Sequence, residues 1–169
     1  MSSQRTVSLA LLTEDTYAPK FIEGIIKRLI ETNWINNKIN VYKSNRTYRK
    51  IQPCTDKLRR ILSVAIDMCD KILIFLDADG RPRDEIVNEV KSHLGSELAK
   101  LLGKRIFVIV FHEEIEEWIL PNTQKPSDVL KRKERYEKWS LPDHVNRVDF
   151  YAANQLDSFR DFINALNDC

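Results

Sequence analysis

The segment Lys71-Ile-Leu-Ile-Phe-Leu-Asp77-Ala-Asp79-Gly80 carries the clearest structural signal in this chain. An uninterrupted apolar run that ends in a turn residue is typical of a β-strand buried on both faces, as in parallel sheets. In open α/β sheets, ligands bind just beyond the carboxyl ends of the strands. Two carboxylates in D-x-D spacing at that position suit a hard cation such as Mg²⁺. The segment therefore predicts a central strand that ends in a metal-binding edge.

Length and composition favour a single folded domain. The chain has 169 residues, of which 43% are hydrophobic and 31% are charged, as in ordinary globular proteins. The 27 basic and 25 acidic residues nearly cancel. Because the net charge is only +2, it does not by itself indicate a partner, and the local distribution of charge matters more.

Several features predict a cytoplasmic protein with no membrane partner. No run of about 18 apolar residues is present, so no transmembrane helix is expected. The segment Met1–Arg5 leads into a strand pattern without the layout of a secretion signal. Cys54, Cys69 and Cys169 are odd in number and lack CxxC spacing, which argues against a disulfide framework or a zinc site.

Strand-like and helix-like patterns alternate along the chain, and this alternation predicts βαβ units around a mainly parallel sheet. The expected architecture is a three-layer, Rossmann-like α/β sandwich of four to five strands, with a core at about 6–120 and an extension at about 121–169. Strands are expected at 6–13, 38–42, 71–77 and 105–111, with a last short one at 145–151. Helices are expected after residue 15, from about 56, from 82 to 103, at 128–139 and at 156–166, with irregular structure at 44–55.

Acidic residues follow three of the predicted strands: Glu14 after the first, Asp77 and Asp79 after the third, and Glu113, Glu114, Glu116 and Glu117 after the fourth. Like charges a few ångströms apart repel by about 1 kcal/mol per pair in water, and by more near a protein surface. A fold that gathers them needs a cation or raised pKa values. A bound metal would in turn activate water or stabilise charge on a phosphate.

Each acid also has a plain structural interpretation. Asp15 and Asp79 are at positions where a carboxylate commonly caps the next helix. The run 113–117 fits a solvated helical turn anchored by Trp118. Taken singly, each acid is more often structural, but acids at three strand ends together favour a shared site.

The order of these motifs resembles the Toprim superfamily, the metal-binding domain of topoisomerases, primases and certain nucleases. A Toprim domain carries a glutamate after its first strand and a D-x-D after a later one, as in Leu12-Thr-Glu14-Asp15 and Phe75-Leu-Asp77-Ala-Asp79-Gly80. The chain is also similar to small Toprim-like proteins in which the fourth strand leads into E-h-E-x-W, here Glu114-Ile-Glu116-Glu-Trp118. The similarity spans about residues 11–120.

The resemblance implies a set of roles. Glu14 would act as general acid/base or metal ligand, Asp77 and Asp79 would be catalytic metal ligands, and Glu114 and Glu116 would be the further acids of the site. The implied cofactor is Mg²⁺, with Mn²⁺ as a substitute. Many Toprim domains have a glycine after the glutamate, where this chain has Asp15.

Other motif interpretations fail on position or spacing. In haloacid-dehalogenase-type phosphatases the D-x-D follows the first strand, whereas here it follows the third. A calcium loop would need a helix before the motif and an oxygen ligand where Arg81 stands. No phosphate loop of the G-x-x-x-x-G-K-[ST] type and no G-x-G-x-x-G turn occurs. The histidines His93, His112 and His144 lack metal-ligand spacing.

Two basic stretches are candidates for contacts with nucleic acid. The stretch 43–60 contains few acids and includes tyrosines, so its cations can neutralise phosphates while aromatic rings stack on bases. Its predicted nucleic-acid-binding residues are Arg46, Arg49, Lys50, Lys57 and Arg60. The stretch 125–138 includes Glu134 and Glu137, which favours an ordinary charged helix.

Together with this resemblance, the sequence predicts a Mg²⁺-dependent Toprim-like enzyme that acts on nucleic-acid phosphodiesters as a nuclease. The alternative is a protein without catalytic activity that retains the fold and binds nucleic acid or a protein partner in a regulatory role.

Overall fold

The computed structural model describes residues 6–36, 38–53 and 55–167. The predictions made for Met1–Arg5, Cys54 and Cys169 lie outside these residues. Cys69 is a buried free thiol. Within the described ranges, no helix combines the length and apolar character needed to cross a membrane.

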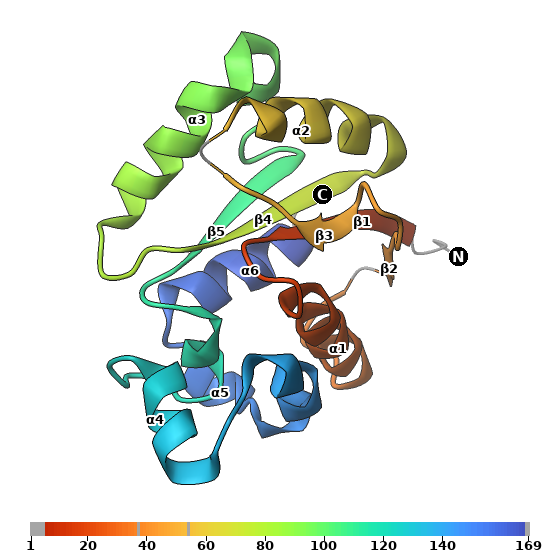
Figure 1. Cartoon of the computed structure of the whole chain (residues 1–169). Coiled ribbons are helices and arrows are strands. Elements are labelled where there is room, and N and C mark those ends of the chain that lie inside the picture. Colours follow the sequence, from red (N-terminus) through yellow and green to blue (C-terminus); the bar gives the residue numbers. More distant parts are fainter. Residues whose placement is uncertain (1–5, 37, 54, 168–169) are drawn as a thin grey trace.

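A parallel sheet forms the centre of the molecule (Figure 1). Its strand order is β2-β1-β4-β5, and β3 pairs with β1 beside β2. The predicted strand at 71–77 is confirmed as a central one, because it pairs with β1 on one side and β5 on the other. The strands are β1 (Thr6–Thr13), β2 (Lys38–Val41), β3 (Tyr48–Lys50), β4 (Lys71–Asp77) and β5 (Ile106–Phe111).

Strand β3 was not expected, because its sequence is polar and lies in the stretch predicted to be irregular. It forms through pairing with the second half of β1, where Tyr48 lies opposite Leu11 and Lys50 opposite Thr13. The backbone N–H of Ile51 continues this ladder by donating to the Thr13 carbonyl at 2.7 Å. The pairing partner, and not the local pattern, makes this segment a strand.

Helices cover both faces of the sheet, which confirms the three-layer architecture (Figure 1). Successive side chains of β4 point to opposite faces. Leu73 and Phe75 therefore join one apolar cluster, with α1 and α6, while Ile72, Ile74 and Leu76 join the other, with α2 and α3. The helices are α1 (Ala18–Glu31), α2 (Asp56–Met68), α3 (Arg83–Ala99) and α6 (Asp157–Asn167).

The helix expected from residue 82 to 103 is shorter and is interrupted. It ends at Ala99, and Gly95 has a φ of 78°, outside the helical region. Glycine accepts this conformation without the clash that a Cβ would introduce. The apolar pattern continues through Leu98 on both sides of the interruption, which is why the sequence reads as one helix.

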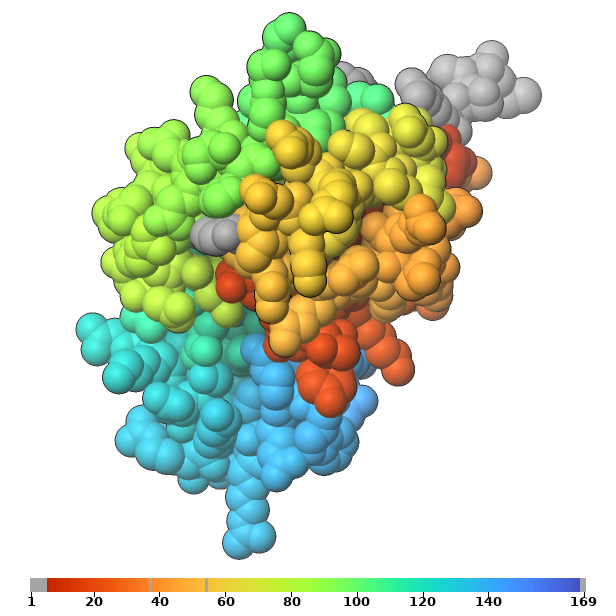
Figure 2. All heavy atoms as spheres, turned by 45° about the horizontal axis from the view of Figure 1, so that its top comes forward, coloured from red at the N-terminus to blue at the C-terminus, as the bar shows by residue number. Residues whose placement is uncertain are grey.

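Residues 121–153 gather at one end of the molecule, coloured cyan to light blue in Figure 2. They pack on the face of the sheet that α1 covers, and Leu130, Leu141 and Phe150 belong to the same apolar cluster as that helix. Their elements are α4 (Pro126–Glu134), η2 (Lys138–Arg147) and α5 (Phe150–Ala153), and η1 (Ile115–Trp118) precedes them, where η marks 3₁₀ helix.

Two predictions for this region were wrong. Residues 145–151, all of them described, form the end of η2 and the start of α5 in place of a strand. The Arg28 guanidinium donates to the carbonyls of Val145 and Val148 at 2.7 and 2.9 Å, and so satisfies groups that a strand would have paired. The helix expected to reach residue 139 ends at Glu134, because Arg135 adopts a left-handed φ of 57°.

Candidate functional site

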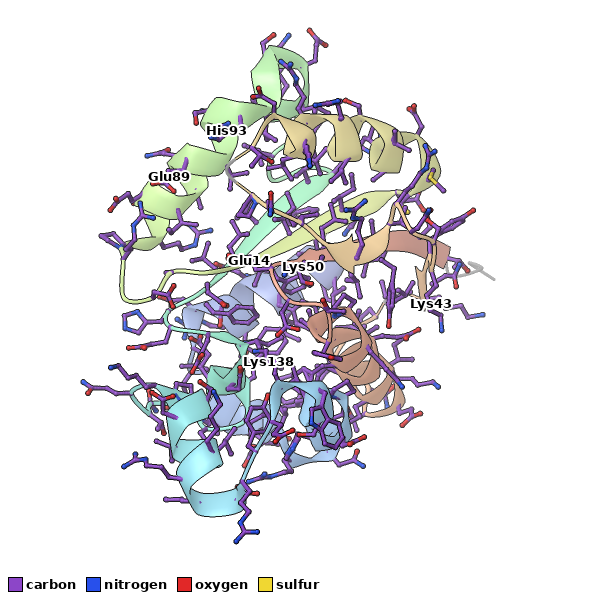
Figure 3. The ribbon with its side chains drawn as sticks, viewed as in Figure 1. Glu14, Lys43, Lys50, Glu89, His93 and Lys138 are labelled. Atoms are coloured by element: carbon purple, nitrogen blue, oxygen red, sulfur yellow. The ribbon has the colours of Figure 1, made fainter. Side chains whose placement is uncertain are left out.

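Glu14, the acid that follows β1, is hydrogen-bonded directly to the D-x-D motif. Strands β1 and β4 are neighbours, and the backbone N–H of Asp77 donates to Glu14 Oε1 at 2.7 Å. The Glu14 side chain thus extends the β1–β4 ladder by one hydrogen bond. Figure 3 shows Glu14 at the end of β1, beside Lys50.

The turn after Asp77 is held against the exit of β5. The N–H groups of Ala78 and Gly80 donate to the carbonyls of Phe111 and His112, each at 2.9 Å. Asp79 and Gly80 both have positive φ, 50° and 83°. Aspartate tolerates this conformation better than most residues, and glycine adopts it freely. The D-x-D-G spacing therefore has a backbone reason as well as a chemical one.

Carboxylates from three strand ends converge on Asp77. Burial raises the pKa of the Asp77 carboxyl to about 8, and four like charges add to the shift: Glu14, Asp79, Glu114 and Glu117. Burial also raises the pKa of Glu14, with Asp79 adding to the shift and the hydrogen bond from Asp77 opposing it. The structure thus places the predicted residues Glu14, Asp77, Asp79 and Glu114 in one electrostatic group.

These carboxylates do not form a closed metal cage. Across residues 6–36, 38–53 and 55–167, no three His, Cys, Asp or Glu side chains are close enough together to hold a metal ion. Mg²⁺ typically binds through one or two carboxylates, several waters and substrate phosphates. The oxygen donors around Asp77 fit that mode of binding in their chemistry.

Glu116 has a different environment from the other predicted ligands. Its side chain is fully buried, and Lys138 Nζ contacts both carboxylate oxygens, Oε2 at 2.8 Å. The same ammonium lies 3.0 Å from Asp15 Oδ2. Burial raises the pKa of Glu116 and lowers that of Lys138, whereas their direct contact favours the ionised form of both. An internal cation therefore already neutralises this part of the acidic edge (Figure 3).

Asp15, directly after Glu14, has two partners. Its Oδ1 accepts from the backbone N–H of Tyr17 at 2.5 Å, in the turn that precedes α1. Its Oδ2 is the atom that Lys138 contacts. The residue therefore combines a hydrogen bond within this turn with a role in the charge pairing around Glu116.

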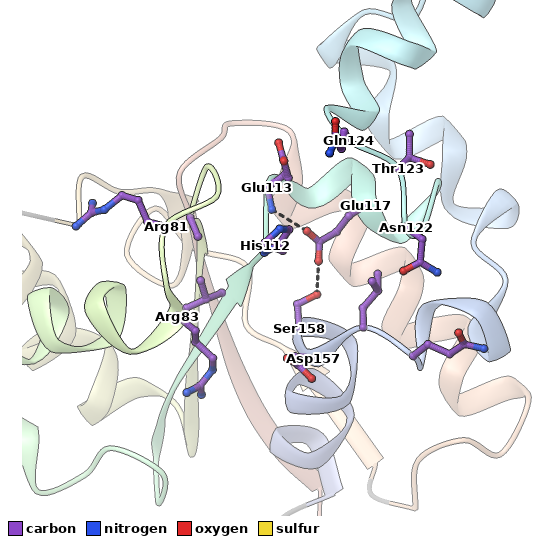
Figure 4. A pocket seen from close by; sticks show the side chains of 14 residues that line it. Arg81, Arg83, His112, Glu113, Glu117, Asn122, Thr123, Gln124, Asp157 and Ser158 are labelled. Carbon is purple, nitrogen blue, oxygen red and sulfur yellow. Dashed lines mark hydrogen bonds between the residues drawn. The ribbon is translucent and has the colours of Figure 1, made fainter.

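Glu117 was among the acids after the fourth strand but not among the proposed ligands. The structure places it beside Asp77, only 5% exposed. It accepts hydrogen bonds from the Glu113 N–H at 3.0 Å and from the Ser158 hydroxyl at 2.8 Å (Figure 4). Ser158 in turn accepts from Trp118 Nε1 at 3.0 Å. Nothing in the sequence near Ser158 or Lys138 signals these long-range contacts.

Glu114 is linked to the C-terminal extension. Its Oε1 accepts from the backbone N–H of Ser127, in the first turn of α4, at 2.8 Å. The N-terminal end of a helix carries partial positive charge, which attracts a negatively charged group such as a carboxylate. The extension therefore supplies partners to Glu114, to Glu116 through Lys138, and to Glu117 through Ser158.

The predicted nucleic-acid-binding residues are all exposed: Arg46, Arg49, Lys50, Lys57 and Arg60. Lys50 lies at the end of β3, in register with Thr13 and so next to Glu14. Lys57 is in the first turn of α2, which begins shortly after β3 ends. The Arg49 guanidinium is held by the carbonyl of Lys50 at 2.9 Å. Part of the first basic stretch thus lies along the acidic edge.

Comparison of the chain with protein-family models, with curated proteins and with solved structures finds no match. The resemblance to Toprim domains therefore rests on the residues themselves: Glu14, the D-x-D pair and the segment from Glu114 to Trp118.

Proposed function

We propose that this protein is a Toprim-like enzyme that uses Mg²⁺ or Mn²⁺ to hydrolyse nucleic-acid phosphodiesters. The observation that carries the proposal is the convergence of Glu14, Asp79 and Glu114 on the partly buried carboxyl of Asp77. Gathered acids of this kind at the carboxyl edge of a parallel sheet favour cation binding. Exposed cations such as Lys50 lie next to them and suit a phosphate backbone.

In this proposal Asp77 and Asp79 would hold the cation, which when bound stabilises charge on the phosphate and activates water. Glu14 Oε1 is engaged by the backbone N–H of Asp77, which fixes the orientation of the carboxyl group. Its Oε2 is then the atom that takes a proton from the attacking water. Burial raises the pKa of Glu14 and so makes it a better base than an exposed glutamate.

A direct test incubates the purified protein with single- and double-stranded DNA and RNA in Mg²⁺, Mn²⁺ or EDTA. The wild type is expected to cut at least one substrate in the presence of metal, and Asp77→Asn is expected to lose at least 100-fold of that activity. Asp67→Asn, an exposed aspartate on α2, is the matched control and should behave as the wild type. The proposal fails if no substrate is cut or if Asp77→Asn cuts as fast as the wild type.

A second candidate function is binding without catalysis, in a regulatory or scaffold role. It is favoured by the partners that several acids already have: Lys138 on Glu116, the Ser127 N–H on Glu114 and the Asp77 N–H on Glu14. Under this alternative, the protein binds nucleic acid equally well in EDTA and in Mg²⁺ and leaves it uncut under every metal condition.

A further inference from the structure

A cavity of about 490 Å³ opens beside the acidic edge, between the exit of β5 and the start of α6 (Figure 4). Its volume lies in the range of small-molecule sites. Ala78 and Glu117 in its lining connect it to the D-x-D turn and to the carboxylates around Asp77. No residue predicted from the sequence to bind nucleic acid lines this cavity.

The cavity is suited to an uncharged, planar polar group. Three exposed side-chain amides line it, those of Asn122, Gln124 and Gln155, and amides can donate to and accept from the edge of a base. The imidazole of His112 offers a face on which a base can stack, and Leu156 contributes apolar surface.

Charge in the cavity disfavours a phosphate. Its acids, which include Glu113 and Glu117, would repel one. The two arginines in the lining are already paired, Arg81 with Glu85 at 2.7 Å and Arg83 with Asp161 at 3.1 Å. A nucleobase, whose amino groups can donate to carboxylates, is compatible with this lining, whereas a phosphate group is not.

The cations that a phosphate needs lie beside this cavity, in and just before α4. An open hollow of about 530 Å³ is lined by Lys125, Lys131 and Arg132, by one acid, Asp128, and by Gln124, which also lines the first cavity. The cations outnumber the carboxylate in this lining. Within the part of the chain that the structure describes, none of these three cations has a carboxylate within 4.0 Å.

The two acids expected to neutralise this basic stretch, Glu134 and Glu137, have other hydrogen-bond partners. Glu134 pairs with Arg147 at 2.7 Å, and Glu137 accepts from the indole N–H of Trp139. Lys131 is near enough to Glu116 to lower the pKa of that carboxyl, which places the basic face of α4 beside the acidic edge. Neither Glu134 nor Glu137 therefore pairs with Lys125, Lys131 or Arg132.

We propose that these two adjoining hollows bind single-stranded nucleic acid. An unpaired base enters the cavity beside Glu117, and the neighbouring phosphates lie on Lys125, Lys131 and Arg132. A base in a duplex is stacked and its pairing edge is occupied, so it cannot enter. The inference rests on the proposed function and specifies its substrate as a single strand, either DNA or RNA.

The test measures binding alone, by fluorescence anisotropy of labelled 12-mer oligonucleotides in EDTA. Single strands of DNA or RNA should bind the wild type at least tenfold more tightly than the matching duplex. Lys131→Ala/Arg132→Ala should weaken single-strand binding about 10-fold or more and reduce the slope of log K against log salt by about 2. Lys91→Ala/Lys104→Ala, which removes the same charge from exposed sites outside the two hollows, should leave binding unchanged.

The base cavity has its own test. Replacing one base of the oligonucleotide at a time by an abasic site should weaken wild-type binding at one position by about 3-fold or more. Gln124→Ala/Gln155→Ala should bind intact and abasic strands equally, because the lost amides no longer contact the base. A wild type that ignores every abasic site would overturn the assignment of the cavity.

The outcomes separate this inference from the proposed enzyme activity. Single-strand binding that depends on Lys131 and Arg132, without cleavage in any metal, supports the inference and removes the enzymatic proposal. Metal-dependent cleavage that is unaffected by Lys131→Ala/Arg132→Ala, or equal binding of duplex and single strand, overturns the inference and leaves the enzymatic proposal standing.

Discussion

At the scale of single residues, Asp77 is the side chain on which the candidate site depends. Its side chain is partly buried, and four other carboxylates interact with it. Burial and these four carboxylates all favour the protonated form of Asp77. An ionised Asp77 is therefore held at an energetic cost that a bound divalent cation would relieve.

The substitution Asp77→Asn is expected to raise stability when no metal is present. At pH 8 in EDTA, removing the charge relieves repulsion worth about 1–2 kcal/mol, which corresponds to roughly 2–8 °C in Tm for a chain of this size. Mg²⁺ should raise the Tm of the wild type but not that of the variant. Differential scanning calorimetry with Asp67→Asn as control measures both effects. A variant less stable than the wild type in EDTA would show that the carboxylate is a structural partner.

Lys138 is the second decisive residue, because it is the cation that contacts fully buried Glu116. Lys138→Met should destabilise the fold by roughly 1–3 kcal/mol, since it leaves a buried carboxylate without its ammonium. The figure is below that for a fully buried pair because the Lys138 side chain is 36% exposed. The double variant Lys138→Met/Glu116→Gln should recover most of the loss in urea unfolding. If the double variant is no more stable than Lys138→Met, the two residues are not coupled.

At the scale of elements, α6 supports the site although it contributes no acid to it. The hydroxyl of Ser158, in its first turn, joins Trp118 to Glu117. Trp118 itself is buried among aromatic rings, with Phe75, Phe111 and Phe162 between 5.0 and 6.4 Å from it, centroid to centroid. The position of Glu117 beside Asp77 therefore depends on the packing of α6 against the sheet.

Ser158→Ala tests this support. The change leaves Trp118 Nε1 and one oxygen of Glu117 without their partner in a buried place, so a loss of about 1–3 kcal/mol is expected in chemical unfolding. Ser63→Ala, where an exposed hydroxyl bonds a carbonyl four residues earlier, is the control and should change stability by less than about 0.5 kcal/mol. Equal effects of the two substitutions would refute the role of Ser158.

The contact between α1 and η2 fixes the C-terminal extension on the core. A Cβ added at Gly24 would lie 2.6 Å from Val145 Cγ2, closer than real contacts allow. Valine has few alternative rotamers, so it cannot easily move away. Gly24→Ala should therefore destabilise by about 1 kcal/mol or more despite its higher helix propensity. Gly24→Ala/Val145→Ala should be more stable than the sum of the two single changes predicts, and additive effects would contradict the contact.

At the scale of the whole molecule, the acidic edge gives folding stability a distinctive pH dependence. Burial and neighbouring acids raise the pKa of Asp77 to about 8. Folding raises the pKa of such an acid above its value of about 4 in the unfolded chain. The acid then contributes fully to stability below about pH 4, and this contribution is lost as the pH rises through the pKa of the folded state. In EDTA, the free energy of unfolding should accordingly fall between about pH 4 and pH 8.

Mg²⁺ should reverse that trend. Because a cation binds the ionised carboxylates, its stabilising effect should be small near pH 5 and grow toward pH 8. Thermal unfolding across this range, with and without Mg²⁺, measures the difference. Stability in EDTA that rises steadily to pH 8 would show that the carboxylates around Asp77 are not gathered as the structure places them.

The sequence by itself determined the features that depend on local pattern. The apolar run into Asp77, the spacing of apolar residues in α1 and α2, and the alternation of the two kinds of segment were enough to predict a parallel α/β sandwich. The order of Glu14, the D-x-D pair and Glu114 was enough to place acids at one edge, because parallel strands all end on the same side.

Only the tertiary structure decided the features that rest on contacts between distant parts of the chain. The polar segment Tyr48–Lys50 becomes a strand because it pairs with β1. Residues 145–151 do not form a strand, because Arg28 satisfies the carbonyls of Val145 and Val148. Lys138 and Ser158 reach the acids from segments with no sequence signal for that role. The physical reason is the distance along the chain over which each effect acts. The periodicity of apolar side chains acts within a few residues, whereas strand pairing and the burial of charged groups are decided only when the whole chain is packed.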